Sequence, residues 1–252
     1  MAKDLIAESS KYFQSSYQEM IFYQFYSRWK PELGRRETWI EAIDRYMDYM
    51  KGKVGDKLTD TEYNEVREGL LNQEVCPSMR LLWAAGKAAD ATNVTAYNCA
   101  YVAPTNWRDL SEIMYVSMCG AGCGFAVEKE NVSQFPVIKE QTGEKLDDIV
   151  VDDSRDGWCE AFLMAATAWS EGKDVEIDYS MVRPAGASLE TMGGRASGPQ
   201  PLIDLMNFTR DKMLAAQGRQ LTALELHDII CQIGLIVVAG GVRRSALISL
   251  SE

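Results

Sequence analysis

The segment Met192–Pro199 constrains the fold of this chain more than any other stretch of its sequence. It reads Met-Gly-Gly-Arg-Ala-Ser-Gly-Pro, and this density of glycine and proline is unsuited to the interior of a helix or strand. A helical pattern begins directly afterwards, and Pro199 and Pro201 suit a helix entrance because first-turn residues need no amide donor. A glycine-rich loop that leads into a helix presents free amides to an anion. The segment therefore indicates either a phosphate-binding loop or a tight connection that binds nothing.

Two further glycine-rich stretches, Cys119–Gly124 and Gly240–Arg244, are predicted to be turns. Together with the first they favour a phosphate-binding enzyme over a set of simple connections. Neither common nucleotide motif fits the stretch at Cys119–Gly124. No Gly-Lys-Ser/Thr follows it, as a P-loop requires, and the third glycine of a dinucleotide fingerprint is not at its proper spacing.

The composition is that of an ordinary globular protein. The chain has 252 residues, of which 46% are hydrophobic and 25% charged, enough for one large domain or two small ones. A net charge of −11 argues against broad binding to nucleic acid or membrane surfaces. The sequence contains no apolar run of transmembrane length and no signal-peptide core at its start, so we expect a cytoplasmic protein with reduced cysteines.

Hydrophobic spacing changes along the chain. Residues 1 to about 90 are predicted to be a helical region, and residues 91–252 a separate α/β domain. In the first region one aromatic-rich helix is expected to end at Pro31 and Gly34. From Asn98 onward, predicted strands alternate with predicted helices, which favours a largely parallel sheet. The expected strands are 92–103, 125–127, 149–151, 175–179 and 246–250, and the expected helices of this part are 107–118, 154–170, 201–216 and 222–238.

Groups for acid–base catalysis are scarce. His227 is the only histidine, and it lies beside Asp228 in a helical pattern, which is more typical of a structural helix residue than of a catalytic one. Histidine triads and histidine-rich metal sites are therefore not expected. Cys119 and Cys123 have no second pair at metal-site spacing, so no metal site is predicted. Cys99, on a predicted strand, is either a small buried hydrophobe or a redox thiol.

The order of several motifs distinguishes between these two interpretations of Cys99. In order, the motifs lie at Asn98-Cys99, 118–125, 153–158, 182–187, 193–199 and 238–246. Each motif is weak alone, but their order together is highly specific. The series resembles the catalytic subunit of ribonucleotide reductase, most of all the adenosylcobalamin-dependent class II enzymes of the ribonucleoside-triphosphate reductase type. The resemblance covers about residues 70 to 252.

The resemblance implies a fold and a set of site residues. The fold would be a helical region followed by the first half of a ten-stranded α/β barrel, whose two five-stranded parallel halves surround a cysteine-bearing finger loop. Cys99 would be one member of the redox-active cysteine pair, with its partner outside this chain. The implied substrate-binding residues are Pro77, Ser78, Asn98, Ala196, Ser197 and Gly198. The loop that relays effector identity would comprise Gly241, Val242, Arg243, Arg244 and Ser245.

The resemblance also implies a reaction and its participants. Ribonucleotides, as triphosphates or diphosphates, would be converted to 2′-deoxyribonucleotides by thiyl-radical chemistry, with adenosylcobalamin bound mainly by the missing part. The implied partners are a ribonucleotide substrate, a deoxynucleotide effector and a thiol reductant such as thioredoxin. No membrane and no direct nucleic-acid contact are expected.

Two departures from the family pattern bear on this interpretation. The Asn-x-Cys-x-Glu motif of the radical cysteine and base glutamate does not occur in the 252 residues, and the other redox cysteines are missing as well. We therefore expect an N-terminal half that is inactive alone, associates through its uncovered sheet, and works with a C-terminal half supplied as a separate chain. The short N-terminal region has no recognisable ATP-cone domain, and this compactness suggests a phage source.

Two other interpretations remain open at the level of sequence. The first is a catalytically inactive nucleotide-binding regulatory or scaffold protein derived from the same fold. Cys99 argues against it, because a protein that only binds nucleotides has no need of a thiol there. The second is an unrelated α/β enzyme, which the scarcity of histidine disfavours.

Overall fold

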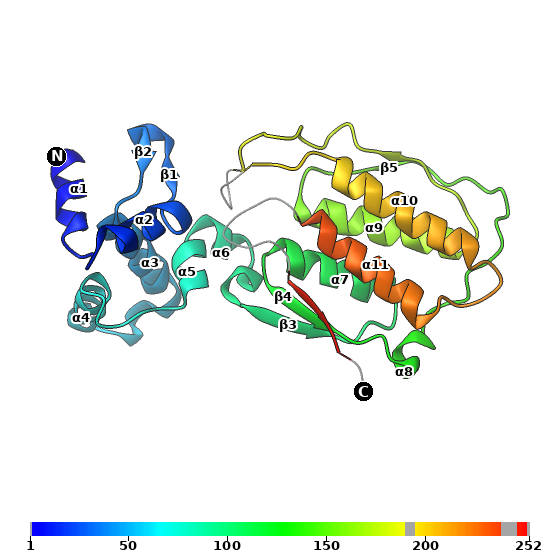
Figure 1. Ribbon diagram of the computed structural model, residues 1–252, viewed down its shortest axis with the longest axis horizontal. Coiled ribbons are helices and arrows are strands. Elements are labelled where there is room, and N and C mark those ends of the chain that lie inside the picture. Colours follow the sequence, from blue (N-terminus) through cyan, green and yellow to red (C-terminus); the bar gives the residue numbers. More distant parts are fainter. Residues whose placement is uncertain (1, 190–194, 238–245, 251–252) are drawn as a thin grey trace. The chain divides into compact units, whose positions relative to one another are not determined.

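The computed structural model describes residues 2–189, 195–237 and 246–250. The chain divides into two compact units, and the division falls between Tyr97 and Asn98 (Figure 1). The boundary expected from sequence, near residue 90, lies within the last helix of the first unit. Among the described residues, no helix combines the length and apolar character needed to cross a membrane.

The N-terminal unit is mainly helical. Capping boxes begin two of its helices: Thr38 with Glu41, and Thr59 with Glu62, exchange side-chain and backbone hydrogen bonds at the helix start. Its core is formed by Phe22, Trp39, Ile43, Leu71 and their neighbours. The helices are α1 (Ala2–Ser10), α2 (Ser16–Phe25), α3 (Trp39–Val54), α4 (Asp60–Leu71), α5 (Met79–Ala84) and α6 (Lys87–Ala91), with 3-10 turns η2 (Gly55–Lys57) and η3 (Asn93–Ala96).

The prediction that one helix ends at Pro31 and Gly34 is wrong. The helix ends at Phe25, and a small antiparallel hairpin follows, made of β1 (Trp29–Lys30), the 3-10 turn η1 (Pro31–Leu33) and β2 (Arg35–Arg36). Pro31 opens the turn, where its fixed φ is suitable, and Gly34 closes it with a left-handed φ of 61°. The same two residues that interrupt a helix thus form the hairpin turn.

The C-terminal unit has its core among helices. Leu110, Phe162, Leu205 and Ile230 come from four different helices and are fully buried in one cluster. These four helices lie between two small sheets in Figure 1. The helices of this unit are α7 (Trp107–Met118), α8 (Lys129–Val132), α9 (Arg155–Ser170), α10 (Gln200–Ala215) and α11 (Ala223–Ile236).

Both sheets of this unit are parallel, as the alternation of strands and helices predicts. The larger has the order β3 (Cys99–Val102), β4 (Gly122–Phe125), β7 (Leu247–Ser249), with Cys99 opposite Gly122 and Cys123 opposite Leu247. The smaller pairs β5 (Ile149–Val150) with β6 (Ile177–Asp178). The described residues therefore form a mixed helix-and-sheet structure, and they do not form a ten-stranded barrel.

The glycine-rich stretch Cys119–Gly124 is not a phosphate-binding turn, which corrects the sequence-based expectation. Its second half is the central strand β4, hydrogen-bonded on both sides to β3 and β7. A Cβ on Gly124 would lie 3.4 Å from the Tyr101 ring and 3.5 Å from the Ile248 side chain. These glycines therefore allow side chains of the flanking strands to lie over the central strand. A glycine pattern alone does not distinguish this role from a turn.

The first strand of the unit is also shorter than predicted. The sequence favours a strand over residues 92–103, whereas α6 and η3 occupy residues up to Ala96 and β3 begins at Cys99. Thr92 accounts for the difference, because its side chain accepts a hydrogen bond from the Val94 amide and initiates η3.

Candidate active site

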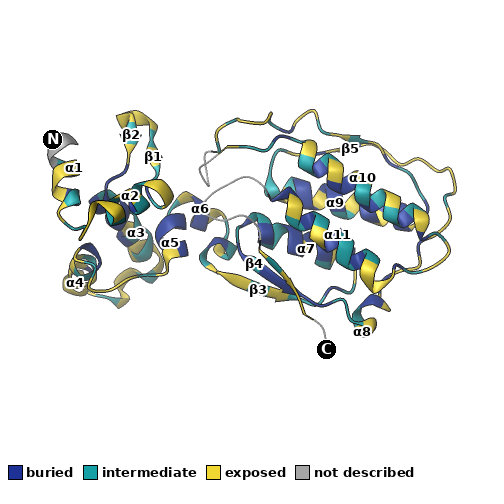
Figure 2. Ribbon diagram, viewed as in Figure 1, coloured by how far each residue is buried: buried dark blue, intermediate teal, exposed yellow. Residues whose placement is uncertain are grey.

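Cys99 lies at the start of β3 on an uncovered face of the larger sheet. Along β3, Cys99 and Tyr101 are exposed, whereas Ala100 and Val102 are partly buried (Figure 2). Strand register places Gly122 and Gly124 beside the two exposed residues, and Ile248 follows on β7 with 59% exposure. We call this surface the open sheet face; it comprises Cys99, Tyr101, Gly122, Gly124, Ile248 and Leu250. Parallel sheets are normally covered on both faces, so a bare face of this kind is unusual.

The opposite face of the same sheet is packed against the helices. Val102, Cys123, Phe125 and Leu247 belong to the main hydrophobic cluster or lie directly against it. Burial raises the pKa of the Cys123 thiol, which disfavours its reactive thiolate form. Cys99 and Cys123 thus lie on neighbouring strands but in opposite environments, and of the two only Cys99 presents an accessible thiol.

The backbone around Cys99 is held by the central strand. The carbonyl oxygen of Asn98 accepts a hydrogen bond from the Gly122 amide at 2.8 Å, one residue before the cysteine. Asn98 itself is exposed, like Cys99. The thiol is therefore carried on a rigid strand, as a positioned reacting group requires.

Pro77 and Ser78 form the turn that leads into α5 in the N-terminal unit. Ser78 is the N-cap, and its Oγ accepts a hydrogen bond from the Leu81 amide at 3.3 Å. The side chain of Ser78 is exposed, whereas Leu82 and Ala84, later in the same helix, are buried. The turn at the start of α5 is thus polar and exposed, whereas the end of the helix is buried.

Two of the quoted motifs come together as one loop, which runs from Arg183 to Gly198. The Gly186 amide donates to the Ala196 carbonyl at 2.9 Å, and the Ala196 amide donates to the Ala187 carbonyl at 2.8 Å. Arg195 adds a side-chain bond to the Gly186 carbonyl at 2.8 Å. The segment Ala196–Gly198 is therefore held by the motif 183–187, although residues 190–194 at the middle of the loop lie outside the described residues.

Gly198 is required by the geometry of this loop. Its φ is +75°, and a Cβ at this position would lie 2.9 Å from the Ala185 backbone nitrogen. Both features exclude an ordinary side chain. The loop directly precedes α10, and Pro199 is the N-cap residue of that helix with Pro201 in its first turn.

An ion pair that sequence reasoning did not single out holds the base of the loop. Arg183 Nε donates to Asp153 Oδ2 at 2.7 Å, and Asp153 directly precedes Ser154, the N-cap of α9. The two side chains are about one third exposed, so the pair contributes modestly to stability. Both residues belong to the motif series. Their positions could have pointed to the pair, because Asp153 precedes a predicted helix start and Arg183 lies close to a glycine.

Other sequence-based candidates lie elsewhere or outside the described residues. Gly241, Val242, Arg243, Arg244 and Ser245 are not among the described residues. His227 is on α11, with its ring centroid 5.6 Å from that of Phe125. Cys119 is fully buried, with its sulfur 3.3 Å from Arg155 Nη1. Within the described ranges, no three or more His, Cys, Asp or Glu side chains are grouped to hold a metal ion.

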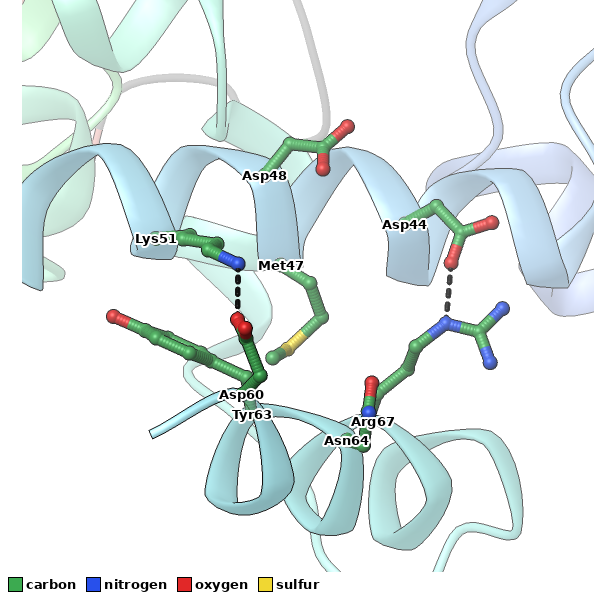
Figure 3. Close-up of a pocket in the computed structure, with 8 residues that line it drawn as sticks. All are labelled: Asp44, Met47, Asp48, Lys51, Asp60, Tyr63, Asn64 and Arg67. Carbon is green, nitrogen blue, oxygen red and sulfur yellow. Dashed lines mark hydrogen bonds and ion pairs between the residues drawn. The ribbon is translucent and has the colours of Figure 1, made fainter. Parts of the chain in front are cut away.

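A groove between α3 and α4 is lined by charged residues of both signs (Figure 3). Its cations already have partners: Lys51 Nζ lies 2.6 Å from Asp60, and Arg67 Nε lies 2.7 Å from Asp44. With Asp48 also in the lining, carboxylates outnumber cations. The groove therefore does not suit a nucleotide phosphate, and its ion pairs join the two helices.

Comparison with known proteins finds two family models that match parts of the chain. Residues 2–87 match the ribonucleotide reductase alpha domain, and residues 126–212 match the insertion domain of B12-dependent ribonucleotide reductase. The chain is therefore similar to an N-terminal part of the class II ribonucleotide reductases. The alpha-domain match includes the Pro77–Ser78 turn, and the insertion-domain match includes the Arg183–Gly198 loop. The alpha-domain match also extends the similarity to the first helices of the chain, which the motif series does not reach.

Named relatives and a solved structure agree with this family. The adenosylcobalamin-dependent ribonucleoside-triphosphate reductase of Lactobacillus leichmannii is 29% identical over 90% of this chain and 40% of its own length. The Euglena gracilis enzyme of the same name is 28% identical over 93% of the chain and 35% of its own length. A crystal structure of a B12-dependent class II ribonucleotide reductase superposes with a TM-score of 0.71 at 21% identity, over 98% of this chain and 44% of that chain.

These coverages bear on what the chain represents. It spans less than half of the length of the class II reductases that it matches. The similarity to the crystal structure concerns the fold. In this chain that fold is a mixture of helices and sheet.

Proposed function

We propose that this chain forms the N-terminal portion of an adenosylcobalamin-dependent ribonucleoside-triphosphate reductase, which converts ribonucleotides to 2′-deoxyribonucleotides. The observation that carries the proposal is Cys99, an accessible thiol on a rigid strand at the open sheet face. The relatives that bear this enzyme name support the reaction class.

Cys99 would act as one of two thiols that reduce the ribose. When a second cysteine joins it, the two S–H bonds break, two protons and two electrons are released, and one sulfur–sulfur bond forms. At the ribose the C2′–O bond breaks, a C2′–H bond forms, and the hydroxyl leaves as water. A thiol reductant such as thioredoxin then cleaves the disulfide and regenerates both thiols. The second cysteine lies outside this chain in the proposal.

The substrate would be positioned by the exposed loops. Ser78 carries a hydroxyl, and Ser197 and Gly198 carry backbone amides, groups that suit phosphate oxygens. Asn98, adjacent to Cys99, would contact the substrate near the reacting thiol. A deoxynucleotide effector would act through Gly241–Ser245, where Arg243 and Arg244 offer guanidinium groups to nucleotide phosphates or bases.

The cofactor that we propose is the one named for the relatives. His227 on α11 is the only histidine of the sequence, and its ring lies against the ring of Phe125 on β4. The described part of the chain offers no grouped metal ligands. We therefore assign adenosylcobalamin mainly to the remaining reductase sequence. The functions assigned to this chain are thiol reduction and substrate positioning.

The open sheet face supports the need for further polypeptide. Tyr101 and Ile248 are 57% and 59% exposed there, and β3 and β7 are the outer strands of the sheet. Unpaired strand edges and bare apolar faces are typical of surfaces that another chain segment covers. We propose that the missing part of the reductase adds strands to this sheet and completes a ten-stranded barrel around the face that carries Cys99.

The test is Cys99→Ser in the assembled reductase, that is, this chain together with the polypeptide that supplies the remaining sequence. We expect multiple turnover with a dithiol reductant to fall by about three orders of magnitude or more, since one redox thiol is lost. Nucleotide binding should stay within about twofold of the unsubstituted enzyme, because a hydroxyl replaces a thiol of similar size.

Cys231→Ser is the matched control, because Cys231 is also an exposed free thiol but lies on α11. Normal turnover by the Cys99 variant would remove this residue from the mechanism. An unsubstituted assembly that binds nucleotides but produces no deoxyribonucleotide would instead identify the chain as a catalytically inactive nucleotide-binding protein.

A further inference from the structure

Two arginines hold the C-terminal end of α5. Arg45 Nη1 donates to the Leu82 carbonyl at 2.9 Å and to the Ala85 carbonyl at 3.1 Å. Arg28 Nε donates to the Trp83 carbonyl at 3.1 Å, and its Nη2 donates to the same oxygen. The last carbonyls of a helix have no partner within the helix, and here they lie among buried residues. The guanidinium groups supply the missing hydrogen bonds.

A single buried carboxylate holds both arginines in place. Arg45 Nη2 and Nε donate to the two carboxylate oxygens of Glu37 at 2.7 and 3.1 Å, a bidentate arrangement. The Arg28 backbone amide donates to the same carboxylate at 3.3 Å. Glu37 is 1% exposed, and burial lowers the pKa of Arg28 to about 10, which leaves its guanidinium protonated at neutral pH.

The β1–β2 hairpin brings these groups together. Arg28 directly precedes β1 and Glu37 directly follows β2, and the Glu37 amide donates to the Arg28 carbonyl at 2.8 Å. Arg45 comes from α3, nearly two helical turns after the start of that helix at Trp39. We call these three residues the α5 clamp.

We propose that the α5 clamp positions the Pro77–Ser78 turn for the substrate. This inference rests on the proposed function, in which Ser78 contacts substrate phosphate. The helix α5 has only six residues, too few to be stable without its tertiary contacts. A displacement at its clamped end would therefore be passed to Ser78 at its other end. Arg28 and Arg45 hydrogen-bond to α5, and Glu37 acts on α5 only through them, so the proposal makes all three positioning residues.

The first test is Arg45→Lys in the assembled reductase. Lysine keeps the positive charge but cannot bridge the Leu82 carbonyl, the Ala85 carbonyl and Glu37 together. We expect KM for the ribonucleotide to rise about fivefold or more, equivalent to one misplaced hydrogen bond, with kcat within about twofold. Hydrogen–deuterium exchange of the peptide covering residues 76–85 should become faster.

Ile43→Val is the matched control. It lies in the same helix as Arg45, its side chain is fully buried, and it makes no polar contact with α5. The loss of one methylene should lower stability to an extent comparable with Arg45→Lys while leaving KM unchanged. If KM rises equally in both variants, general destabilisation explains the effect and the clamp has no positioning role.

Ser78→Ala separates this inference from the proposed function. A rise in KM for both Ser78→Ala and Arg45→Lys supports the two together. A rise for Ser78→Ala alone would overturn the clamp inference and leave the function intact. Faster exchange in Arg45→Lys with an unchanged KM in both variants would show that the clamp orders α5 but that Ser78 does not contact substrate, which overturns the inference and that part of the proposed function.

Discussion

Replacement of Gly198 by alanine tests the loop geometry most directly. The residue has a φ of +75°, and an added Cβ would lie 2.9, 3.2 and 3.3 Å from the nitrogen, Cβ and Cα of Ala185. Two of these three atoms are backbone, so they cannot move aside by a change of rotamer. The substitution therefore either moves the Gly198 segment away from Ala185 or leaves strain in the backbone at that contact.

The cost can be divided into two contributions. An L-residue in the left-handed region costs about 1–2 kcal/mol, offset by about 0.4–1 kcal/mol because alanine restricts the unfolded chain more than glycine does. The contact with Ala185 adds about 1–3 kcal/mol of overpacking. We expect Gly198→Ala to lower the free energy of unfolding of the C-terminal unit by about 2–3 kcal/mol, and Gly198→Val to lower it further.

Gly186→Ala provides a control in the same loop. Gly186 has a φ of +87°, but nothing lies within 4 Å of its added Cβ. It therefore carries the dihedral cost without the contact, and we expect a loss of about 1 kcal/mol or less. Urea unfolding of the two variants, followed by circular dichroism, measures the difference, which should be about 2 kcal/mol.

The same pair of variants tests substrate binding in the assembled reductase. If Ala196–Gly198 contacts the nucleotide, KM should rise for Gly198→Ala, and more for Gly198→Val, because the displaced loop no longer presents its amides. Equal destabilisation by Gly186→Ala and Gly198→Ala would refute the role of the Ala185 contact. An unchanged KM and kcat in Gly198→Val would remove the loop from the substrate site.

Two further predictions concern thiol reactivity and acid stability. In the folded chain, iodoacetamide should label Cys76, Cys99 and Cys231 before the other three cysteines, because these are exposed and because burial raises the pKa of Cys159 to about 12; mass spectrometry showing early labelling of Cys159 would contradict the packing of α7 against α9. The hydrogen bond from Arg219 lowers the pKa of Glu225 to about 2 from 4.5, so this carboxylate stabilises the fold above about pH 4.5 and loses that contribution as pH falls toward 2. Glu225→Gln should lower the free energy of unfolding by about 1 kcal/mol at pH 7, after allowance for solvent screening, and by almost nothing near pH 2. An equal loss at both pH values in urea unfolding would be inconsistent with the ion pair.

The sequence alone determined the long helices of the C-terminal unit, the start of α4 and the parallel character of the sheets in the C-terminal unit. The capping-box pattern at Thr59 and Glu62 indicates the start of α4, and the spacing of Trp158, Phe162 and Trp169 indicates the interior of α9. Such features depend on residues within one or two helical turns, so a linear pattern contains the necessary information. The ordered motif series likewise led to the reductase family, because motif order is itself a property of the sequence.

Tertiary structure decided the features that join distant segments. Gly122 and Gly124 are compatible with a turn in isolation, and only pairing with β3 and β7 makes them a central strand. The sequence does not show which thiol is accessible: Cys99 and Cys123 lie on neighbouring strands, and the helices on one side of the sheet leave the first exposed and bury the second. The α5 clamp joins Arg28 and Arg45 to carbonyls 37 to 55 residues away in sequence. Contacts over such separations depend on the packing of whole elements, and local propensity does not contain that information.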